Sequence, residues 1–385
     1  PRSQHCISSA ASDGYKSQHM PSRIASGDNA GSLPVLRVVN MHHQPRRTVF
    51  SAPLLAALQE RVERGEQCMV LLNRRGYAPV LHCADCDWKS DCPHCSAHQV
   101  FHKIDRTLRC HHCGFAERVP HACPACGNTD ISTIGRGTER LEEHLAELLA
   151  DIRRPDGGLV RIVRIDADST KLKGALESQL AQVHAGEVDV LVGTQMIAKG
   201  LDFPNVTLVG VLNADTALNL PDFRSSERTF QLLTQVAGRA GRADKKGEVL
   251  IQTYNPNHYA ITFAKEQDYE GFYRYEMGIR KNLGYPPYYF TVGLTFSHKS
   301  EEFVVKKAYE TVAFLRQHLK DAIQILGPTP KPIARTHNLY HYQIILKYRH
   351  EDRLEEVLNQ ILDWTQEREN QDLRLIIDNE PQNMM

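Results

Sequence analysis

The sequence predicts an α/β protein: a parallel β-sheet with helices on both faces, a cysteine-rich module inserted into it, and a small α+β domain after it. Three observations predict this fold class. Short β-branched runs alternate with amphipathic segments over residues 33–255, which is typical of a parallel sheet covered by helices. Eight cysteines form four Cys-x-x-Cys pairs within residues 83–126. From about residue 256 the elements follow a different order, with two β-α-β passes.

The elements of the α/β part follow from their hydrophobic periodicity. Apolar residues at helical steps predict helices, and continuous apolar runs predict buried strands. Gly65 is expected to end the first helix. In chain order we expect a helix over 52–64, a strand over 67–72, a helix over 138–149, a strand over 160–165, a helix over 172–184, strands over 188–192 and 206–212, a helix over 226–236 and a strand over 248–253.

The C-terminal part is predicted by the same criteria to be a small α+β domain of the split β-α-β kind. We expect helices over 272–283, 303–318 and 352–364, with strands over 290–296, 323–326, 340–347 and 373–378. The cysteine-rich block interrupts one strand-to-helix connection, so it is an insertion. The expected organisation is a poorly ordered leader over 1–32, the α/β domain over 33–81 and 128–255, the insertion over 82–127 and the C-terminal domain over 256–385.

Each Cys-x-x-Cys pair is typical of a zinc knuckle, in which a tight turn holds two thiolates on one side of a tetrahedral ion. The spacing favours nested pairing, because joining neighbours across the five-residue gap would force two knuckles onto a very short loop. Nearby histidines are competing ligands, and a disulfide cluster is the alternative interpretation. Two closed, structural Zn²⁺ sites are therefore expected: an inner one at Cys92, Cys95, Cys110 and Cys113, and an outer one at Cys83, Cys86, Cys123 and Cys126.

Composition excludes some classes of function. No apolar run approaches the roughly 18 residues of a membrane span, and the first residues lack the apolar region of a secretory signal, so a cytoplasmic protein is expected. The net charge is +0, so any basic surface for nucleic acid must be local. One candidate surface lies in the cysteine-rich block, and a scattered solvated face is its alternative interpretation; it contains Trp88, Phe101, Arg106, Arg109, His111 and His112.

A second constellation is the segment Gln235-Val236-Ala237-Gly238-Arg239-Ala240-Gly241-Arg242. It places two guanidinium groups near one another on a tight backbone. Guanidinium is suited to bidentate phosphate recognition and can neutralise charge on a transferred phosphoryl group. Taken alone, the motif is also compatible with a helix end that carries two solvated arginines.

A third constellation lies upstream, over residues 193–206. Thr194 follows a predicted strand, so its hydroxyl and backbone amide can meet a phosphate. Gly200 allows close approach of the backbone to a ligand, and Asp202 can accept a hydrogen bond from a ribose hydroxyl or orient a water molecule.

Together these motifs resemble the late motifs of superfamily 2 helicases, and their order is closest to the PriA (primosomal protein N′) family of replication-restart helicases. The resemblance covers roughly residues 33–385. It rests on these motifs, on the eight cysteines, and on the segments Leu72-Asn73-Arg74-Arg75-Gly76-Tyr77-Ala78-Pro79, Gly135-Arg136-Gly137-Thr138-Glu139, Leu283-Gly284-Tyr285-Pro286-Pro287 and Leu326-Gly327-Pro328-Thr329-Pro330.

The resemblance implies a RecA-like parallel-sheet helicase lobe with an inserted binuclear zinc-binding module, followed by the small α+β domain. In that family two such lobes enclose ATP with Mg²⁺ and drive 3′-to-5′ unwinding of forked DNA. This sequence contains neither a Gly-x4-Gly-Lys-[Ser/Thr] loop nor an Asp-Glu-x-His box. ATP with Mg²⁺ is therefore expected only together with a first lobe, and this chain alone is expected to be inactive. The alternative is a catalytically silent zinc- and DNA-binding fragment of a truncated gene.

The resemblance also implies roles for single residues and for partners. The expected partners are forked or single-stranded DNA, single-strand binding protein and the primosome and helicase-loading proteins, with no membrane and a monomeric chain. Arg242 is expected to be the arginine finger, Arg239 a second phosphate contact and Gln235 a residue that places them; Gly200 and Asp202 are expected to face the nucleotide, and Thr194, Thr138, Arg74 and Arg75 to contact DNA.

Overall fold

The structure is a computed structural model of the chain. It describes residues 33–382 except 46–47, 73–79, 84, 87, 103–105, 111–112, 135–137, 167–168, 171–173, 199–202, 204, 221, 242–245 and 321–322. The side chains at 102, 132–134, 138–140 and 198 are not described. The predicted leader over 1–32 therefore lies outside the described residues.

A six-stranded sheet forms the centre of the α/β domain, and all its neighbouring strands are parallel, as the sequence predicts. Every residue of β2 is buried, because helices cover both faces. Across the sheet the order is β1 (Val35–Asn40), β11 (Glu248–Thr253), β10 (Val206–Leu212), β2 (Gln67–Leu72), β9 (Val190–Gly193) and β8 (Ile162–Ile165).

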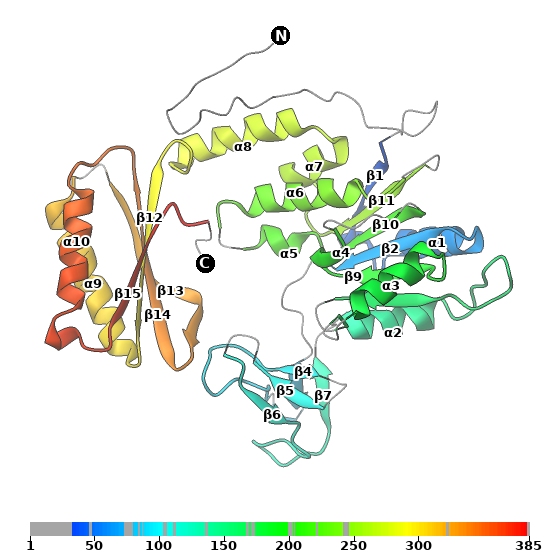
Figure 1. Ribbon diagram of the computed structural model, residues 1–385, viewed down its shortest axis with the longest axis horizontal. Coiled ribbons are helices and arrows are strands. Elements are labelled where there is room, and N and C mark those ends of the chain that lie inside the picture. Colours follow the sequence, from blue (N-terminus) through cyan, green and yellow to red (C-terminus); the bar gives the residue numbers. More distant parts are fainter. Residues whose placement is uncertain are drawn as a thin grey trace, which may run out of the picture.

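Helices pack on the two faces of this sheet around separate cores (Figure 1). α1 (Ala52–Glu63) and α2 (Thr138–Leu148) cover one face. The other face carries α3 (Ala175–His184), α4 (Gln195–Ala198), α6 (Ser225–Ala237) and α7 (Tyr259–Glu266). Gly65, in the left-handed region at φ +72°, directly follows the last turn of α1, which confirms the predicted stop.

Some elements of this domain are absent from the sequence prediction. The strand β1 has an incomplete apolar pattern because it pairs only with β11 at the edge of the sheet. The helices α4 and α5 (Asp215–Leu218) and the 3₁₀ turn η1 (Met41–His43) are too short to show a helical period. The helix α7 is also not predicted, because the sequence indicates only a new order of elements from about residue 256.

The cysteine-rich insertion leaves the α/β domain after β2 and returns to it at α2. Two antiparallel strands flank it, β3 (Val80–Cys83) and β7 (Ile131–Ile134). Beyond them lies a three-stranded antiparallel sheet of β4 (Val100–His102), β5 (Thr107–Arg109) and β6 (Ala116–Arg118). Residues 82–127 are called the cysteine module below; this boundary and the other predicted domain boundaries stay a proposal.

The C-terminal domain is a four-stranded antiparallel sheet with helices on one face, in the order β13-β14-β12-β15. Its two β-α-β passes match the predicted split β-α-β arrangement. In chain order its elements are β12 (Phe290–His298), α9 (Glu301–His318), β13 (Gln324–Thr336), β14 (Leu339–Tyr348), α10 (Leu354–Thr365), the 3₁₀ turn η2 (Arg368–Asn370) and β15 (Arg374–Asn379).

The strand β13 is much longer than the predicted strand over 323–326. Its three prolines, Pro328, Pro330 and Pro332, argue against a strand when the sequence is considered alone. In the structure β13 is at the edge of its sheet, where a residue without an N–H is tolerated. The long β13 and β14 together form a hairpin that reaches the cysteine module (Figure 1).

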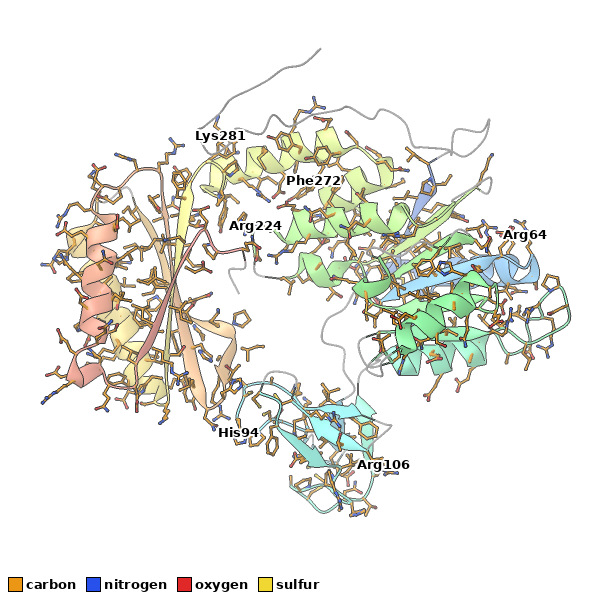
Figure 2. The ribbon with its side chains drawn as sticks, viewed as in Figure 1. Arg64, His94, Arg106, Arg224, Phe272 and Lys281 are labelled. Atoms are coloured by element: carbon orange, nitrogen blue, oxygen red, sulfur yellow. The ribbon has the colours of Figure 1, made fainter. Side chains whose placement is uncertain are left out.

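The helix α8 (Tyr269–Leu283) joins the α/β domain to the C-terminal domain. Phe272 of α8 stacks on Phe230 of α6, with ring centroids 4.1 Å apart. Buried Arg280 forms ion pairs of 2.8 Å with Glu276 and with Glu227 of α6. Arg224, labelled in Figure 2 between the two domains, donates a 2.9 Å hydrogen bond to the carbonyl of Pro381. These contacts fix α8 against α6, and the segment at Pro381 against the residue before α6.

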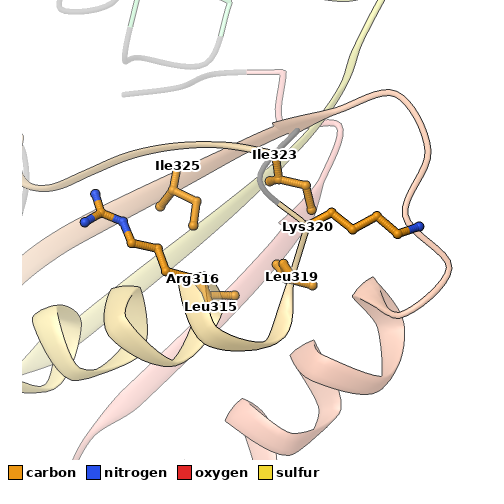
Figure 3. Close-up of a pocket in the computed structure, with 6 residues that line it drawn as sticks. All are labelled: Leu315, Arg316, Leu319, Lys320, Ile323 and Ile325. Carbon is orange, nitrogen blue, oxygen red and sulfur yellow. The ribbon is translucent and has the colours of Figure 1, made fainter.

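A pocket of about 290 Å³ lies in the C-terminal domain between the end of α9 and the start of β13 (Figure 3). Apolar and charged residues line it together, and the charged ends of Arg316 and Lys320 point away from its centre (Figure 3). It is separate from the cysteine clusters and the helicase motifs described below. Its lining consists of Leu315, Arg316, Leu319, Lys320, Ile323 and Ile325.

Candidate functional site

The eight cysteines of the module gather into two groups of four, and all eight are free thiols. The pairing is the predicted nested one. The inner cluster contains Cys92, Cys95, Cys110 and Cys113, and the outer cluster contains Cys83, Cys86, Cys123 and Cys126. Within each group the sulfur atoms all lie within 4.8 Å of one another. The topology explains the nesting, since β3 and β7 bring the first and last knuckles together, while β4, β5 and β6 fold the chain between them.

The sulfur distances fit a tetrahedral ion better than a disulfide. Cys83 and Cys126 have sulfurs 3.6 Å apart, and those of Cys92 and Cys113 are also 3.6 Å apart. A disulfide needs about 2.0 Å. Four sulfurs around zinc at about 2.3 Å lie roughly 3.8 Å apart, close to the distances observed. Both clusters are therefore suited to zinc binding, and four thiolates leave no open position for catalysis.

The two clusters differ in exposure. Three cysteines of the inner cluster are buried, and Cys113 is half-buried; these sulfurs pack with Ala97 and Phe115. In the outer cluster Cys86 and Cys126 are exposed. The inner site is thus the better shielded of the two, although the module offers it few apolar neighbours among the described residues.

Burial and neighbouring groups raise the pKa of some of these thiols and lower the pKa of others. Burial raises the pKa of Cys95 to about 12, and the adjacent sulfurs of Cys113 and Cys110 add to this rise. Burial also acts to raise the pKa of Cys123, but the backbone amides of Cys126 and Ala125, together with the sulfurs of Cys86 and Cys126, lower it, and the pKa falls to about 7. Sulfurs this close resist ionising together, and a divalent cation among them removes the repulsion.

Backbone amides donate hydrogen bonds to the cysteine sulfurs. In three knuckles the second cysteine accepts from the residue two positions further on: Cys86 from Trp88, Cys113 from Phe115 and Cys126 from Asn128. Cys95 is different, because its amide donor is His337, in the turn between β13 and β14. The sequence gives no sign that His337 contacts Cys95, since no local pattern connects residues so far apart in the chain.

Two of the predicted nucleotide residues lie at one end of α6. Gln235 is exposed in the last turn of α6, and Arg239 is half-buried just beyond it. The amide of Gly241 donates a 3.0 Å hydrogen bond to the carbonyl of Val206, the first residue of β10. A Cβ on Gly247 would come within 2.4 Å of the Ala240 and Gly241 backbone, so this segment packs closely against the start of β11. The described part of the arginine motif, residues 235–241, therefore lies at the amino edge of the sheet, next to the first residue of β10.

Two of the predicted DNA residues lie at the opposite edge. Thr194 directly follows β9 at the carboxyl edge of the sheet, where its carbonyl accepts a 3.1 Å hydrogen bond from the amide of Ile197. Thr138 is the first residue of α2. The structure thus separates the nucleotide candidates from the DNA candidates. Arg74, Arg75, Gly200, Asp202 and Arg242 lie outside the described residues, and all these assignments stay predictions.

The basic and aromatic candidates of the cysteine module are only partly described. Arg106 is exposed in the turn between β4 and β5 (Figure 2). The guanidinium of Arg109 donates a 3.0 Å hydrogen bond from Nε to the hydroxyl of Thr107. Trp88 and Phe101 are half-buried. His111 and His112 lie outside the described residues, so the candidate surface stays a prediction.

Three family models match the chain in the order of its domains. The model for the helicase conserved C-terminal domain matches residues 132–244. Within the insertion, the model for the PriA DNA helicase Cys-rich region matches residues 92–118. The model for the primosomal protein N C-terminal domain matches residues 281–382. Among the residues that the structure describes, no helix is long and apolar enough to cross a membrane.

Curated relatives agree with the family models. The chain is 44% identical to the replication restart protein PriA of Bacillus subtilis over 357 residues, which are 92% of this chain and 43% of that protein. It is 38% identical to PriA of Haemophilus influenzae, over 92% of this chain and 48% of that protein. The chain therefore spans less than half the length of these relatives. Its three domains and its relatives place it in the PriA family of replication restart helicases, as a C-terminal portion.

Proposed function

We propose that this chain is the zinc- and DNA-binding C-terminal portion of a replication-restart helicase, and that it unwinds forked DNA 3′ to 5′ with ATP when joined to a first RecA-like lobe. The observation that carries the proposal is the order of parts in one chain. A parallel-sheet lobe with the Gly-Arg-x-Gly-Arg motif carries two four-cysteine clusters in its β2–α2 connection and continues into a split β-α-β domain.

In this proposal, zinc ions bound at both clusters stabilise the fold of the cysteine module. The inner cysteines would hold one ion and the outer cysteines a second. Bound zinc supplies folding free energy that the few buried apolar contacts of the module do not. Our proposal gives the ions no part in hydrolysis, because each donor set is complete with four sulfurs.

The separation of the two groups of helicase residues supports their proposed roles. Arg239 and Gln235, at the amino edge of the sheet, would meet a nucleotide held by a first lobe, with Arg242 as the arginine finger. Gly200 and Asp202 are proposed to face the same nucleotide. Thr194 and Thr138, at the carboxyl edge, would bind the DNA backbone together with Arg74 and Arg75. ATP with Mg²⁺ would bind only between the two lobes. Single-strand binding protein and helicase-loading proteins are the proposed protein partners.

A second candidate is a catalytically silent fragment that binds zinc and branched DNA. The specific observation that favours it is the sequence itself, which contains no phosphate-binding loop of the Gly-x4-Gly-Lys-[Ser/Thr] type. The two candidates predict the same folded chain. They differ in whether joining a first lobe to the chain produces fork-stimulated ATP hydrolysis.

ATP hydrolysis by purified protein tests the proposal. We expect the chain alone to bind a labelled DNA fork in fluorescence anisotropy but to show no DNA-stimulated ATP hydrolysis. Joined to a first lobe from a PriA relative, it should gain fork-stimulated hydrolysis. Robust turnover by the chain alone would refute the two-lobe account. Fork binding without any gain on joining the lobe would favour the silent fragment.

A further inference from the structure

The tip of the β13–β14 hairpin docks on the inner knuckle, Cys92-Pro93-His94-Cys95. Figure 1 shows the hairpin extending from the C-terminal domain to the cysteine module, and Figure 2 places His94 at that end of the module. The tip is a two-residue turn, because Thr336 pairs with Leu339 across it. His337 and Asn338 both adopt positive φ, 52° and 61°, as a type I′ turn requires.

Hydrogen bonds join this turn to each residue between and after the two cysteines. The amide of Asn338 donates to the carbonyl of His94 at 2.9 Å, and the amide of Ser96 donates to the carbonyl of Arg335 at 2.8 Å. The guanidinium of Arg335 donates to the carbonyl of Pro93 at 3.0 Å. The side chains of His94 and Asn338 meet at 3.3 Å. Three of these contacts end on backbone groups of the knuckle, so they depend on its shape.

The hairpin also contacts a cysteine ligand directly. The amide of His337 donates to the sulfur of Cys95, in the role that the local residues Trp88, Phe115 and Asn128 fill in the other knuckles. The C-terminal domain therefore supplies an amide donor to the inner cluster. An amide that donates to an ionised sulfur forms a charge-assisted bond, roughly twice as strong as a neutral one.

We propose that the β13–β14 turn is a zinc-dependent latch: it docks only on the metal-loaded inner knuckle and so fixes the cysteine module to the C-terminal domain. The inference rests on zinc in the inner cluster, as proposed above. The metal holds Cys92 and Cys95 at one spacing, which sets the carbonyls of Pro93 and His94 and the amide of Ser96 in the positions that the turn needs. In return, the turn shields Cys95 and slows the loss of the inner ion.

Hydrogen exchange on the whole chain tests the first half of the latch. Zinc content is measured first, and the amides of His337 and Asn338 are then followed with and without zinc. We expect both amides to exchange at least about tenfold faster after zinc removal, since each loses its acceptor. The Cys95→Ser variant should show the same change, whereas Cys86→Ser, in the outer cluster, should not. Unchanged exchange in the metal-free chain, or an equal effect of Cys86→Ser, would overturn the latch.

Zinc release to a chromogenic chelator tests the second half. The double variant Arg335→Ala/Asn338→Gly removes both side-chain contacts, and glycine preserves the type I′ turn. We expect it to speed release of one ion about tenfold and to leave the other unchanged. Arg349→Ala is the matched control. Arg335 lies over the ring of Tyr340 at 5.7 Å, and Arg349 lies in the same way over the ring of Tyr289 at 4.7 Å, at the other end of the hairpin.

The outcomes separate the latch from the zinc sites themselves. A chain that binds no zinc refutes the proposed metal sites. A chain that binds zinc but releases both ions at unchanged rates in the double variant refutes the latch alone. A control variant that speeds release as much as the double variant also refutes it, because the effect would then follow from general loosening of the hairpin.

Discussion

Removal of zinc is expected to unfold the cysteine module while the six-stranded sheet and the C-terminal domain stay folded. The inner cluster packs with few apolar side chains, whereas the other two domains have large cores of their own. Metal binding to small modules of this kind supplies about 10–16 kcal/mol per ion, far more than their apolar contacts. This is the largest effect that we predict.

Tryptophan fluorescence can measure this unfolding. The chain has two tryptophans, Trp88 in the cysteine module and Trp364 in α10. In a Trp364→Phe variant, the emission of Trp88 should shift toward that of a solvated indole when a chelator removes zinc. Zinc, but not magnesium, should restore it. Unchanged emission in a chain shown to be free of zinc would mean that the module folds without the metal.

Substitution of Arg242 is expected to have the second largest effect. In a protein that carries a first lobe ahead of this chain, Arg242→Ala should lower fork-stimulated ATP hydrolysis by about 10³- to 10⁵-fold, because the proposed finger neutralises charge that develops on the γ-phosphoryl group. Fork affinity should change little, since the DNA candidates Thr194 and Thr138 lie at the other edge of the sheet from the arginine motif.

The matched control for this substitution is Lys246→Ala. Lys246 is an exposed cation four residues further along the chain, so its removal changes the net charge equally. Turnover and fork binding measured on the same preparations decide the result. A loss of fork binding as large as the loss of turnover in Arg242→Ala would contradict the finger assignment, as would an equal loss of turnover in Lys246→Ala.

Much of the fold follows from local sequence pattern. The strands β2 and β10 are mostly apolar runs, and their complete burial in a parallel sheet matches the prediction. The nested pairing of the cysteines is favoured by loop lengths, because the short gap between Cys86 and Cys92 disfavours pairing neighbouring knuckles, and the two clusters observed match this prediction. In both cases the information lies within a few tens of residues.

Other features depend on contacts between distant segments, which local pattern does not record. The length of β13 could not be predicted, because its prolines are tolerated only at the edge of a sheet whose order is set by β12 and β14. The contact between His337 and Cys95 could not be predicted either, because the two residues lie far apart in the chain. The nucleotide candidate Arg239 and the DNA candidate Thr194 come from adjacent motifs, and only the fold places them at opposite edges of the sheet.

The number of zinc ions per chain tests the central claim most directly. Metal analysis of the purified chain, together with Cys95→Ser and Cys86→Ser variants, measures each cluster separately. Two separate four-cysteine sites predict two ions per chain and a loss confined to one cluster in each variant. A single ion per chain in the unmodified protein, or the loss of both ions in Cys86→Ser, would contradict the account of two independent sites.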